Sequence, residues 1–316
     1  MAFPGPSPGQ RLREVILAPG ILVMPGIYDG FSARLVEAAG FKAAAISGAG
    51  VSESRLGWAD VGLMGFEENL HACRAIAACT ALPLRADADT GYGNAVNVHF
   101  TVEGFERAGL AGIMLEDQVW PERCGHMAGK EVISAEEATE KIRAASEARR
   151  DPGFVIKART DATAIHGVGE AIRRLNLYAE AGADLLFADA LLSADDIATV
   201  ARNVRKPLAV NMGFGIRGRP TTPLLSARQL EDIGVAVVTY PRMLTAAAIR
   251  GMANALAALG ESLAEGRVVE RPELLVSFDE INNLMGLPRL RELESRHLST
   301  AERERKYGPA GGAGRE

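Results

Sequence analysis

The sequence predicts an α/β fold, a (β/α)₈ barrel with extra helices at its C-terminal end. Short apolar segments of about four or five residues alternate eight times with segments of helical spacing. The short segments are apolar at consecutive positions, which is typical of parallel strands buried on both faces. Eight such units close most simply into a TIM-type barrel, and 316 residues suit a single barrel of this kind.

The predicted elements follow one another in order after a short helix at 11–17. The strands are expected at 21–25, 43–46, 82–86, 112–115, 154–158, 183–187, 206–210 and 235–238. The helices that follow them are expected at 31–39, 66–79, 96–108, 135–149, 167–181, 194–203, after Ser226, and at 245–259. Gly40 is placed to end the first of these helices, and Ser226 is placed as an N-cap.

The catalytic barrel is therefore expected to span residues 11–260. Residues 1–10 are rich in Pro and Gly and are expected to be flexible. Residues 261–298 are predicted to hold two more helices, at 274–285 and 287–297, whose apolar faces have no place on a filled barrel. We expect these helices to pack on a neighbouring subunit. Residues 299–316 are charged, then Gly-rich, and are predicted to be disordered.

Composition and charge exclude several classes of protein. The net charge of −5 argues against a nucleic-acid partner, since no cluster of Lys and Arg reverses it. The N-terminus lacks the features of a secretion signal, and the apolar runs are shorter than a membrane span, so no membrane partner is expected. Three cysteines form no disulfide framework and are typical of a cytoplasmic protein.

Polar side chains stand at the predicted carboxyl end of every strand, although the strand bodies are apolar. In a barrel these ends build the active site. The contrast favours an enzyme over an inert scaffold. The residues are Tyr28, Asp29, Ser47, Asp87, Asp89, Glu116, Arg159, Asp161, Asp189, Asn211 and Arg242.

Three of these residues, Asp87, Asp89 and Glu116, form an acidic group at the ends of the third and fourth strands. Carboxylates gathered in this way suit a hard divalent cation such as Mg²⁺ or Mn²⁺. The alternative is that they only cap helices. It is disfavoured because converging carboxylates without a cation raise one another's pKa at a cost in stability. No set of three His, or of Cys and His, indicates zinc.

Residues 117–132 have no periodic pattern and are predicted to form an active-site loop. On this loop Cys124 and His126 place a thiol and an imidazole two residues apart. A cysteine on a loop flanked by charge is rarely a core residue. Cys73 and Cys79 lie in a predicted helix and are expected to be packing residues.

Together these motifs resemble the isocitrate lyase / phosphoenolpyruvate mutase superfamily, from Tyr28 to the eighth helix. The resemblance implies a Mg²⁺ cofactor, a small α-oxyacid substrate and, in the lyase branch, a cysteine that acts as general acid on a closing loop. It also implies a homotetramer, a dimer of dimers in which C-terminal helices are exchanged between subunits. The most specific motifs are Ser47-Gly-Ala-Gly, Asp87-Ala-Asp89-Thr-Gly-Tyr-Gly, Glu116-Asp117-Gln118, Cys124-Gly125-His126 and Lys157-Ala-Arg159-Thr160-Asp161.

The Cys-Gly-His motif makes the chain similar to the 2-methylisocitrate lyases and 2,3-dimethylmalate lyases. Four features depart from that pattern. Glu122 stands where a basic residue is usual, and Asp189 stands where a glutamate is usual. Residues 212–219 replace a Thr-Glu-Phe type of segment, and Arg242 adds a cation. The departures lie where the non-reacting half of a substrate would bind, so the group on C3 stays open.

On this resemblance we expect cleavage of a 2-hydroxy-2-methyl di- or tricarboxylate to pyruvate and a smaller acid, by retro-aldol or Claisen chemistry. Asp87 is expected to bind Mg²⁺, with Asp89, Glu116 and Asp60 acting directly or through water. The C1 carboxylate is assigned to Arg159, to Ser47 and to the backbone amides of Gly48 and Ala49.

The resemblance also implies the proton transfers. Cys124 is expected to protonate the second fragment, with His126 tuning the thiol, and Tyr28 is expected to assist deprotonation of the hydroxyl. The remaining substrate contacts are assigned to Gly125, Asp189, Asn211 and Arg242.

Three alternatives stay open. An oxaloacetate decarboxylase or phosphonopyruvate-type C–P enzyme of the same superfamily would not need Cys124. A metabolite-binding relic would bind oxyacids and turn nothing over. A phosphate or nucleotide site at the Gly-rich turn after Thr90 is disfavoured, because the spacing matches neither a Rossmann motif nor a P-loop.

Overall fold

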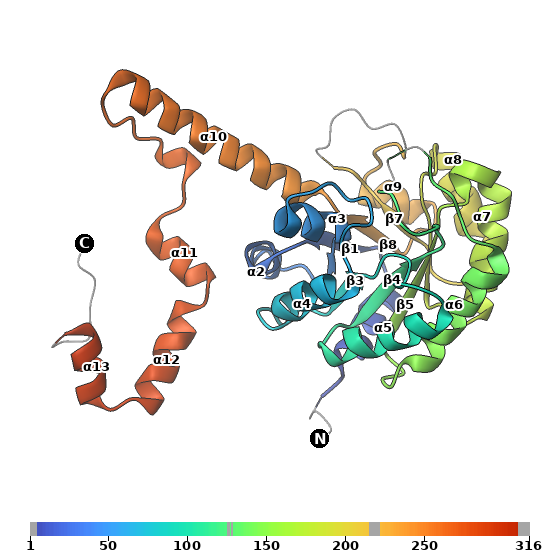
Figure 1. The fold of residues 1–316 in the computed structure, drawn as a ribbon, viewed down its shortest axis with the longest axis horizontal. Coiled ribbons are helices and arrows are strands. Elements are labelled where there is room, and N and C mark those ends of the chain that lie inside the picture. Colours follow the sequence, from blue (N-terminus) through green and yellow to red (C-terminus); the bar gives the residue numbers. More distant parts are fainter. Residues whose placement is uncertain (1–4, 125–126, 128, 215–221, 309–316) are drawn as a thin grey trace. The chain divides into compact units, whose positions relative to one another are not determined.

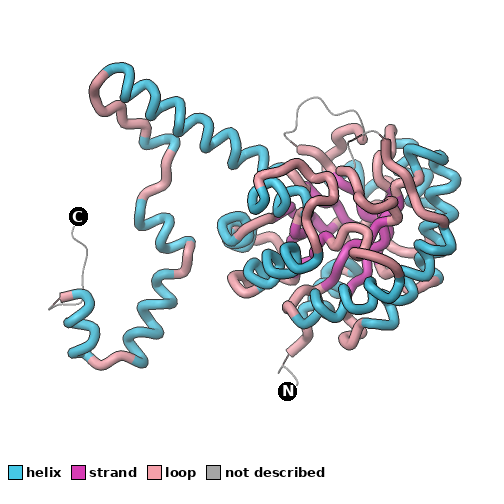
Figure 2. Tube along the Cα trace, in the orientation of Figure 1, coloured by secondary structure: helices cyan, strands magenta, loops and turns pink. Residues whose placement is uncertain are grey.

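The computed structural model describes residues 5–124, 127, 129–214 and 222–308. The chain forms two compact units, Met1–Ile249 and Arg250–Glu316. In the first unit a ring of strands is surrounded by helices (Figures 1 and 2). This arrangement confirms the predicted (β/α)₈ barrel.

All eight strands are parallel, in the order β6-β5-β4-β3-β2-β1-β8-β7. A bridge between Leu186 and Leu208 joins the two ends of this sheet, so the barrel is nearly closed. The strands are β1 (Leu22–Ile27), β2 (Ala44–Ile46), β3 (Leu84–Asp87), β4 (Gly112–Glu116), β5 (Val155–Thr160), β6 (Leu185–Ala188), β7 (Ala209–Asn211) and β8 (Val237–Tyr240).

Helices follow the strands as the sequence predicts, and Ser226 caps α9. Two short elements between β2 and α4 were not predicted. In the first unit the helices are α1 (Pro8–Leu17), α2 (Gly30–Ala38), α3 (Gly48–Val51), the π-helical η1 (Ser52–Leu56), α4 (Phe66–Ala77), α5 (Ala95–Arg107), α6 (Ala135–Ala148), α7 (Thr163–Glu180), α8 (Ala194–Asn203), α9 (Ala227–Asp232) and the start of α10 (Met243–Glu265).

Side chains alternate along each strand between the surrounding helices and the barrel interior. On β4, Ile113 and Leu115 belong to the cluster beneath the helices, whereas Met114 belongs to the interior cluster with Met24 and Phe187. The inward-facing row becomes polar where the strand ends, because the next residue in that row after Met114 is Glu116. The apolar interior therefore supports a polar layer at the carboxyl ends.

The predicted flexible segment 1–10 is wrong for its last residues. Helix α1 begins at Pro8, and the Ser7 and Gln10 side chains form a capping box at its start. Gly9 is buried, and a Cβ atom there would lie 2.5 Å from the backbone nitrogen of Phe154. The N-terminal end of α1 is therefore packed tightly against the segment that leads into β5.

Several predicted bounds need correction. Helix α7 consists of two helical segments that meet at a kink at Gly167, which has a φ of +83°. The predicted helix at 167–181 corresponds to the second segment, and the turn at 163–166 was not predicted. β7 begins three residues later than predicted. The predicted boundary after residue 260 falls inside α10, which continues to Glu265.

The second unit contains the rest of α10, η2 (Pro272–Leu274), α11 (Phe278–Leu284), α12 (Leu287–His297) and α13 (Thr300–Tyr307). The prediction of disorder for 299–316 is wrong for 300–307. Ser299 and Glu302 form a capping box at the start of α13, and Lys306 lies 2.6 Å from Glu294 of α12. None of η2, α11, α12 and α13 contains a buried residue.

Helix α10 exposes much of its apolar surface. Leu256, Leu259 and Leu263 are 68%, 56% and 75% exposed. Within the described residues, α10 is the one helix long and apolar enough to cross a membrane by length and composition. These two criteria alone are weak evidence, because helices at subunit interfaces also meet them.

Candidate active site

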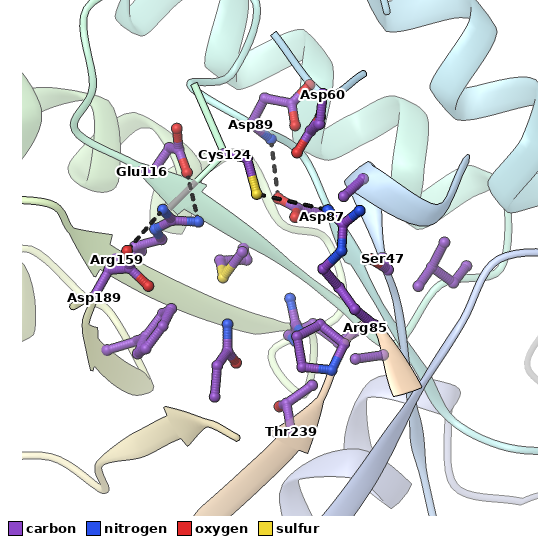
Figure 3. A pocket seen from close by; sticks show the side chains of 18 of the residues that line it. Ser47, Asp60, Arg85, Asp87, Asp89, Glu116, Cys124, Arg159, Asp189 and Thr239 are labelled. Carbon is purple, nitrogen blue, oxygen red and sulfur yellow. Dashed lines mark hydrogen bonds and ion pairs between the residues drawn. The ribbon is translucent and has the colours of Figure 1, made fainter. Parts of the chain in front are cut away.

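A cavity lies at the carboxyl ends of the barrel strands (Figure 3). It encloses about 810 Å³, including space open to solvent. The structure brings most of the residues singled out in the sequence to its walls. They are Ser47, Ala49, Asp60, Asp87, Asp89, Glu116, Cys124, Arg159, Asp189, Asn211 and Arg242.

Four of the predicted residues do not line this cavity: Tyr28, Asp29, Gly48 and Asp161. Asp29 caps α2, and Asp161 binds Arg159. Tyr28 packs against Gly50, where a Cβ atom would lie 2.8 Å from the Tyr28 Cβ. Gly48 lies behind the cavity wall, and a Cβ atom there would lie 3.1 Å from Asp87 Oδ2. A glycine at this position therefore lets the segment after β2 approach the β3 carboxylates. Gly125 and His126 lie outside the described residues.

Four polar lining residues had no role assigned from the sequence: Arg85, Glu122, Thr222 and Thr239. Arg85 lies on β3, two residues before Asp87, so the period of two predicts that both face the interior. Thr239 on β8 is in register with Asn211 and could have been found in the same way. Glu122 was noted only as a departure from the lyase pattern, yet it is 5% exposed and lines the cavity.

One side of the cavity is a group of five carboxyls: Asp60, Asp87, Asp89, Glu116 and Glu122. We call this group the open acidic cluster. Burial, followed by repulsion from Asp87, raises the pKa of Asp60 to about 6. Burial, followed by repulsion from Asp60 and Asp87, raises the pKa of Glu122 to about 8. The pKa values of Asp89 and Glu116 are raised well above their usual range, again first by burial.

The backbone at Asp89 has a φ of +47°, which is uncommon for a residue with a side chain. The Asp89 N–H donates to Asp87 Oδ1 at 3.3 Å, and Asn69 Nδ2 donates to the Asp87 carbonyl at 2.7 Å. Local hydrogen bonds therefore hold the turn that presents Asp87 and Asp89 to the cavity.

The open acidic cluster fits a divalent cation that prefers oxygen ligands. Glu116 Oε1 is buried and accepts no hydrogen bond. Among the described residues, no three His, Cys, Asp or Glu side chains form a group that could hold a metal ion as they are placed. Mg²⁺ can be held by one or two carboxylates and keeps several waters. A bound cation would favour the charged forms of Asp60 and Glu122, whose pKa values are raised by burial and then by repulsion.

Arg159 is held by three carboxylates, of which Figure 3 shows Glu116 and Asp189. Its Nε and Nη2 donate to the two oxygens of Asp161 at 2.8 and 2.9 Å. Its Nη1 lies 3.0 Å from Glu116 Oε2, and its Nη2 lies 3.4 Å from Asp189 Oδ2. The forked face of Arg159, expected to bind substrate, therefore binds Asp161. Lys130 contacts Asp161 and Asp189 at 2.6 and 3.1 Å.

Behind the cavity, Asp117 is buried and fully partnered. It accepts hydrogen bonds from the Thr160 hydroxyl at 2.6 Å and from the Asp161 N–H at 2.9 Å. Arg174 Nη1 and the Tyr178 hydroxyl donate to it at 3.0 and 2.8 Å. Asp117 therefore joins the end of β4 to β5 and α7 and takes no part in lining the cavity.

Cys124 faces the cavity from the predicted loop. Arg242 Nη1 lies 3.7 Å from the Cys124 Sγ. The backbone N–H of Cys124 donates to the Asp60 carbonyl at 3.3 Å. Arg242 also pairs with Glu53, a residue that the sequence analysis missed. The Gln118 side chain holds the preceding residue, because it contacts the backbone N–H and C=O of Arg123 at 3.1 and 3.0 Å.

Known proteins are similar in sequence to this chain over most of its length. A family model described as phosphoenolpyruvate phosphomutase matches residues 12–259. The 2,3-dimethylmalate lyase of Eubacterium barkeri is 39% identical over 289 residues, which cover 92% of this chain and 98% of that protein. The 2-methylisocitrate lyase of Aeropyrum pernix is 38% identical over 291 residues, which cover 90% of this chain and 91% of that protein.

Solved structures match the fold closely. A crystal structure of 2,3-dimethylmalate lyase has a TM-score of 0.85 at 31% identity and covers 94% of this chain and 98% of its own. Oxaloacetate acetylhydrolase with 3,3-difluorooxalacetate has a TM-score of 0.85 at 30% identity, with coverage of 93% and 98%. Phosphonopyruvate hydrolase with oxalate and Mg²⁺ has a TM-score of 0.81 at 31% identity, with coverage of 93% and 100%. One barrel thus serves several named reactions.

Proposed function

This chain belongs to the phosphoenolpyruvate phosphomutase family within the isocitrate lyase superfamily, and from that premise we propose that it is a Mg²⁺-dependent carbon–carbon lyase. The substrate is a 2-hydroxy-2-methyl di- or tricarboxylate of the 2-methylisocitrate or 2,3-dimethylmalate type. The products are pyruvate and a smaller carboxylic acid. The observation that carries the proposal is the thiol of Cys124, which faces the same cavity as the open acidic cluster and Arg159.

The end of the substrate that becomes pyruvate binds between β2 and β5. Ser47 Oγ accepts from the Gly50 N–H at 3.2 Å, which leaves the hydroxyl proton to donate to a substrate carboxylate. Ala49 lines the cavity beside Ser47, and the backbone amides of Gly48 and Ala49 keep their expected role at this carboxylate as a proposal. Arg159 contributes positive charge from the opposite wall, although its forked face is held by Asp161.

The metal is assigned to Asp87, with Asp89, Glu116 and Asp60 acting directly or through water. Mg²⁺ or Mn²⁺, when bound, supplies positive charge that stabilises the oxygen of C2 as the C2–C3 bond breaks. The chain's own contribution is to hold these acids together at the strand ends before the cation arrives. Asp89 and Glu116 are buried, so favourable interactions elsewhere in the fold offset the free-energy cost of holding these acids at the strand ends.

Bond cleavage leaves negative charge on the second fragment, and Cys124 delivers a proton to it from Sγ. Arg242, at 3.7 Å from that sulfur, stabilises the thiolate that remains. Glu53 holds Arg242 in this position. Tyr28, which does not line the cavity, and His126, outside the described residues, keep their expected roles as proposals.

The first experiment is to measure pyruvate release from 2-methylisocitrate and 2,3-dimethylmalate with Mg²⁺ and with EDTA. We expect release with Mg²⁺ only, and its loss in Cys124→Ser. Cys79→Ser is the matched control, because Cys79 does not line the cavity. Full activity in Cys124→Ser on oxaloacetate or phosphonopyruvate would instead support the decarboxylase or C–P alternative. Oxyacid binding without turnover of any substrate would support a relic.

We also propose that the protein acts in the cytoplasm as a homotetramer, a dimer of dimers that exchanges C-terminal helices. The exposed leucines of α10 support this proposal, since water-soluble proteins seldom expose so much contiguous apolar surface. Sedimentation of the full chain tests it. A monomer at micromolar concentration would contradict it.

A further inference from the structure

Two buried cations lie beneath the polar layer of the barrel, and the proposed reaction uses neither. Arg85 on β3 is 4% exposed and Lys157 on β5 is fully buried. They are close enough for the charge of Arg85 to disfavour a charge on Lys157. We call them the interior cations.

Neither interior cation has an acidic partner in direct contact within the described residues. Arg85 Nε is buried and without a hydrogen bond, and Arg85 Nη1 reaches only the Ala86 carbonyl at 3.4 Å. Lys157 Nζ has no hydrogen-bond partner and lies over the Phe187 ring, 4.3 Å from its centre. The segments 125–126, 128 and 215–221 contain no Asp or Glu that could serve instead. Buried charges normally have a partner of opposite sign.

Asp87 stands two residues after Arg85 on β3 and lines the same cavity, and the proposed function assigns it to the metal. With a divalent cation on Asp87, that carboxylate no longer compensates Arg85, and the cation itself repels the guanidinium. The charge of Arg85 then requires an anion from elsewhere. The cavity is the route by which one arrives, because Arg85 lines it.

The strands on one side of Arg85 present small residues to the interior. In the register of the sheet, Arg85 pairs with Ala45 of β2, and Ala45 pairs with Gly26 of β1. Gly26 has no side chain, and Pro241 occupies the place of one, since a Cβ atom at Gly26 would lie 2.4 Å from the Pro241 carbonyl oxygen. Ala45 and Pro241 both line the cavity together with Arg85.

On the other side of β1 and β2, the strands β7 and β8 present further unpartnered polar atoms to the same cavity. Thr239 Oγ1 and Asn211 Oδ1 are buried and accept or donate no hydrogen bond. Arg85 and Thr239 lie on the side of the pocket away from Glu116 and Asp189 (Figure 3). A guanidinium and a hydroxyl can donate to a carboxylate, and the amide oxygen can accept from a substrate hydroxyl.

We infer that Arg85 and Thr239 bind a carboxylate of the substrate inside the barrel, so that Arg85 determines specificity. The substrate of this enzyme then carries a carboxylate, rather than an alkyl group, on the part that faces β3 and β8. The inference rests on the proposed function for the position of the metal and of the reacting end.

The test compares two stable oxyacids that differ only where a methyl group replaces a carboxylate, 2-hydroxybutyrate and malate. Their dissociation constants are measured by titration calorimetry on the full chain with saturating Mg²⁺. A hydrogen-bonded charge pair predicts that wild type binds malate about 10- to 100-fold more tightly. In Arg85→Leu this preference falls below about threefold, while the affinity for 2-hydroxybutyrate stays unchanged.

Arg242→Leu is the matched control, because it removes another cavity cation and leaves Arg85 in place. Loss of the malate preference in Arg242→Leu, with retention in Arg85→Leu, would overturn the inference. Equal affinity of wild type for both acids would overturn it too. Arg85→Gln repeats the test with a polar side chain in case leucine disturbs folding. A lower melting temperature in both Arg85 variants with an unchanged preference would assign Arg85 to the fold alone and also overturn the inference.

The proposed function fails in a different way. Wild type that releases no pyruvate from any tested acid contradicts the lyase, whereas the malate preference needs no turnover. Conversely, an active lyase whose Arg85→Leu variant keeps the malate preference retains its function without the inferred subsite. The two results are therefore read separately.

Discussion

The buried carboxylate of Asp117 and the open acidic cluster lie within a few residues of each other at the strand ends, and they differ in their partners. Asp117 accepts four hydrogen bonds, two of them from Arg174 and Tyr178. In the open acidic cluster, burial raises the pKa values of Asp60, Asp89, Glu116 and Glu122, and Glu116 keeps one oxygen without a hydrogen bond. Burial alone therefore does not identify a site. A buried acid with its donors in place supports the fold, whereas buried acids that face one another need a cation from solution.

The largest expected effect is a loss of activity when the open acidic cluster, rather than Asp117, is changed. Asp87→Asn removes the proposed metal ligand, so we expect pyruvate release to fall about 1,000-fold or more, since a metal supplies several kcal/mol of stabilisation to the transition state. Unfolding by urea in EDTA should show only a small change in stability, because the substitution removes a charge that repels Asp60 and also one that favours the charge of buried Arg85. A variant that is inactive only because it is unfolded in EDTA would contradict the distinction.

The opposite change tests the partnered acid. Asp117→Asn leaves donors unpaired and Arg174 without its buried counter-ion, so we expect the free energy of unfolding to fall by about 3 to 5 kcal/mol. Equilibrium urea unfolding in EDTA measures this value. Asp232→Asn is the matched control, because its pair with Arg228 is exposed and worth less than about 1 kcal/mol. Equal effects of the two changes would remove the contrast between the clusters.

Magnesium should stabilise the protein through the open acidic cluster. At 100 times the dissociation constant, binding to the folded state alone adds about 2.7 kcal/mol to the free energy of unfolding. Thermal melts with increasing Mg²⁺ should show a rising midpoint in wild type and in Asp117→Asn, and a flat one in Asp87→Asn. A midpoint that rises equally in Asp87→Asn would place the metal elsewhere.

The smallest expected effect concerns a partnered acid near the surface. Hydrogen bonds from Arg173, together with Arg174, lower the pKa of Glu170 to about 2. Because the folded pKa lies below the unfolded value, the stabilisation is complete above about pH 4.5 and is lost as the pH falls towards 2. The pair is partly exposed, so we expect less than about 1 kcal/mol. Unfolding of wild type and Glu170→Gln at pH 7 and pH 3 measures it, and a difference that grows at low pH would contradict the sign.

The elements that were predicted wrongly show which local signals compete. Ser299 and Glu302 carry the spacing of a capping box, yet the charged composition after them suggested disorder, and the structure contains α13 there. Ser7 and Gln10 carry a similar signal before α1. In both places a cap of two residues was a better guide than the composition of the whole segment.

The eight strands, their parallel arrangement and the polar residues that end them could all be predicted from the amino-acid sequence. These features follow from local patterns, because a strand buried on both faces is apolar at every position and its end is polar where it meets a cavity. The same patterns led to Cys124, to Asp87 and to Arg159 as residues of one site.

Which of these residues face one another could be read only from the three-dimensional structure. Tyr28 lies outside the cavity, the forked face of Arg159 binds Asp161, and Arg85 lines the interior without an acidic partner. These outcomes depend on the register between strands and on the closing of the barrel, which bring together residues far apart in the chain. The pattern of one segment contains no information about the side chains that a distant segment places beside it.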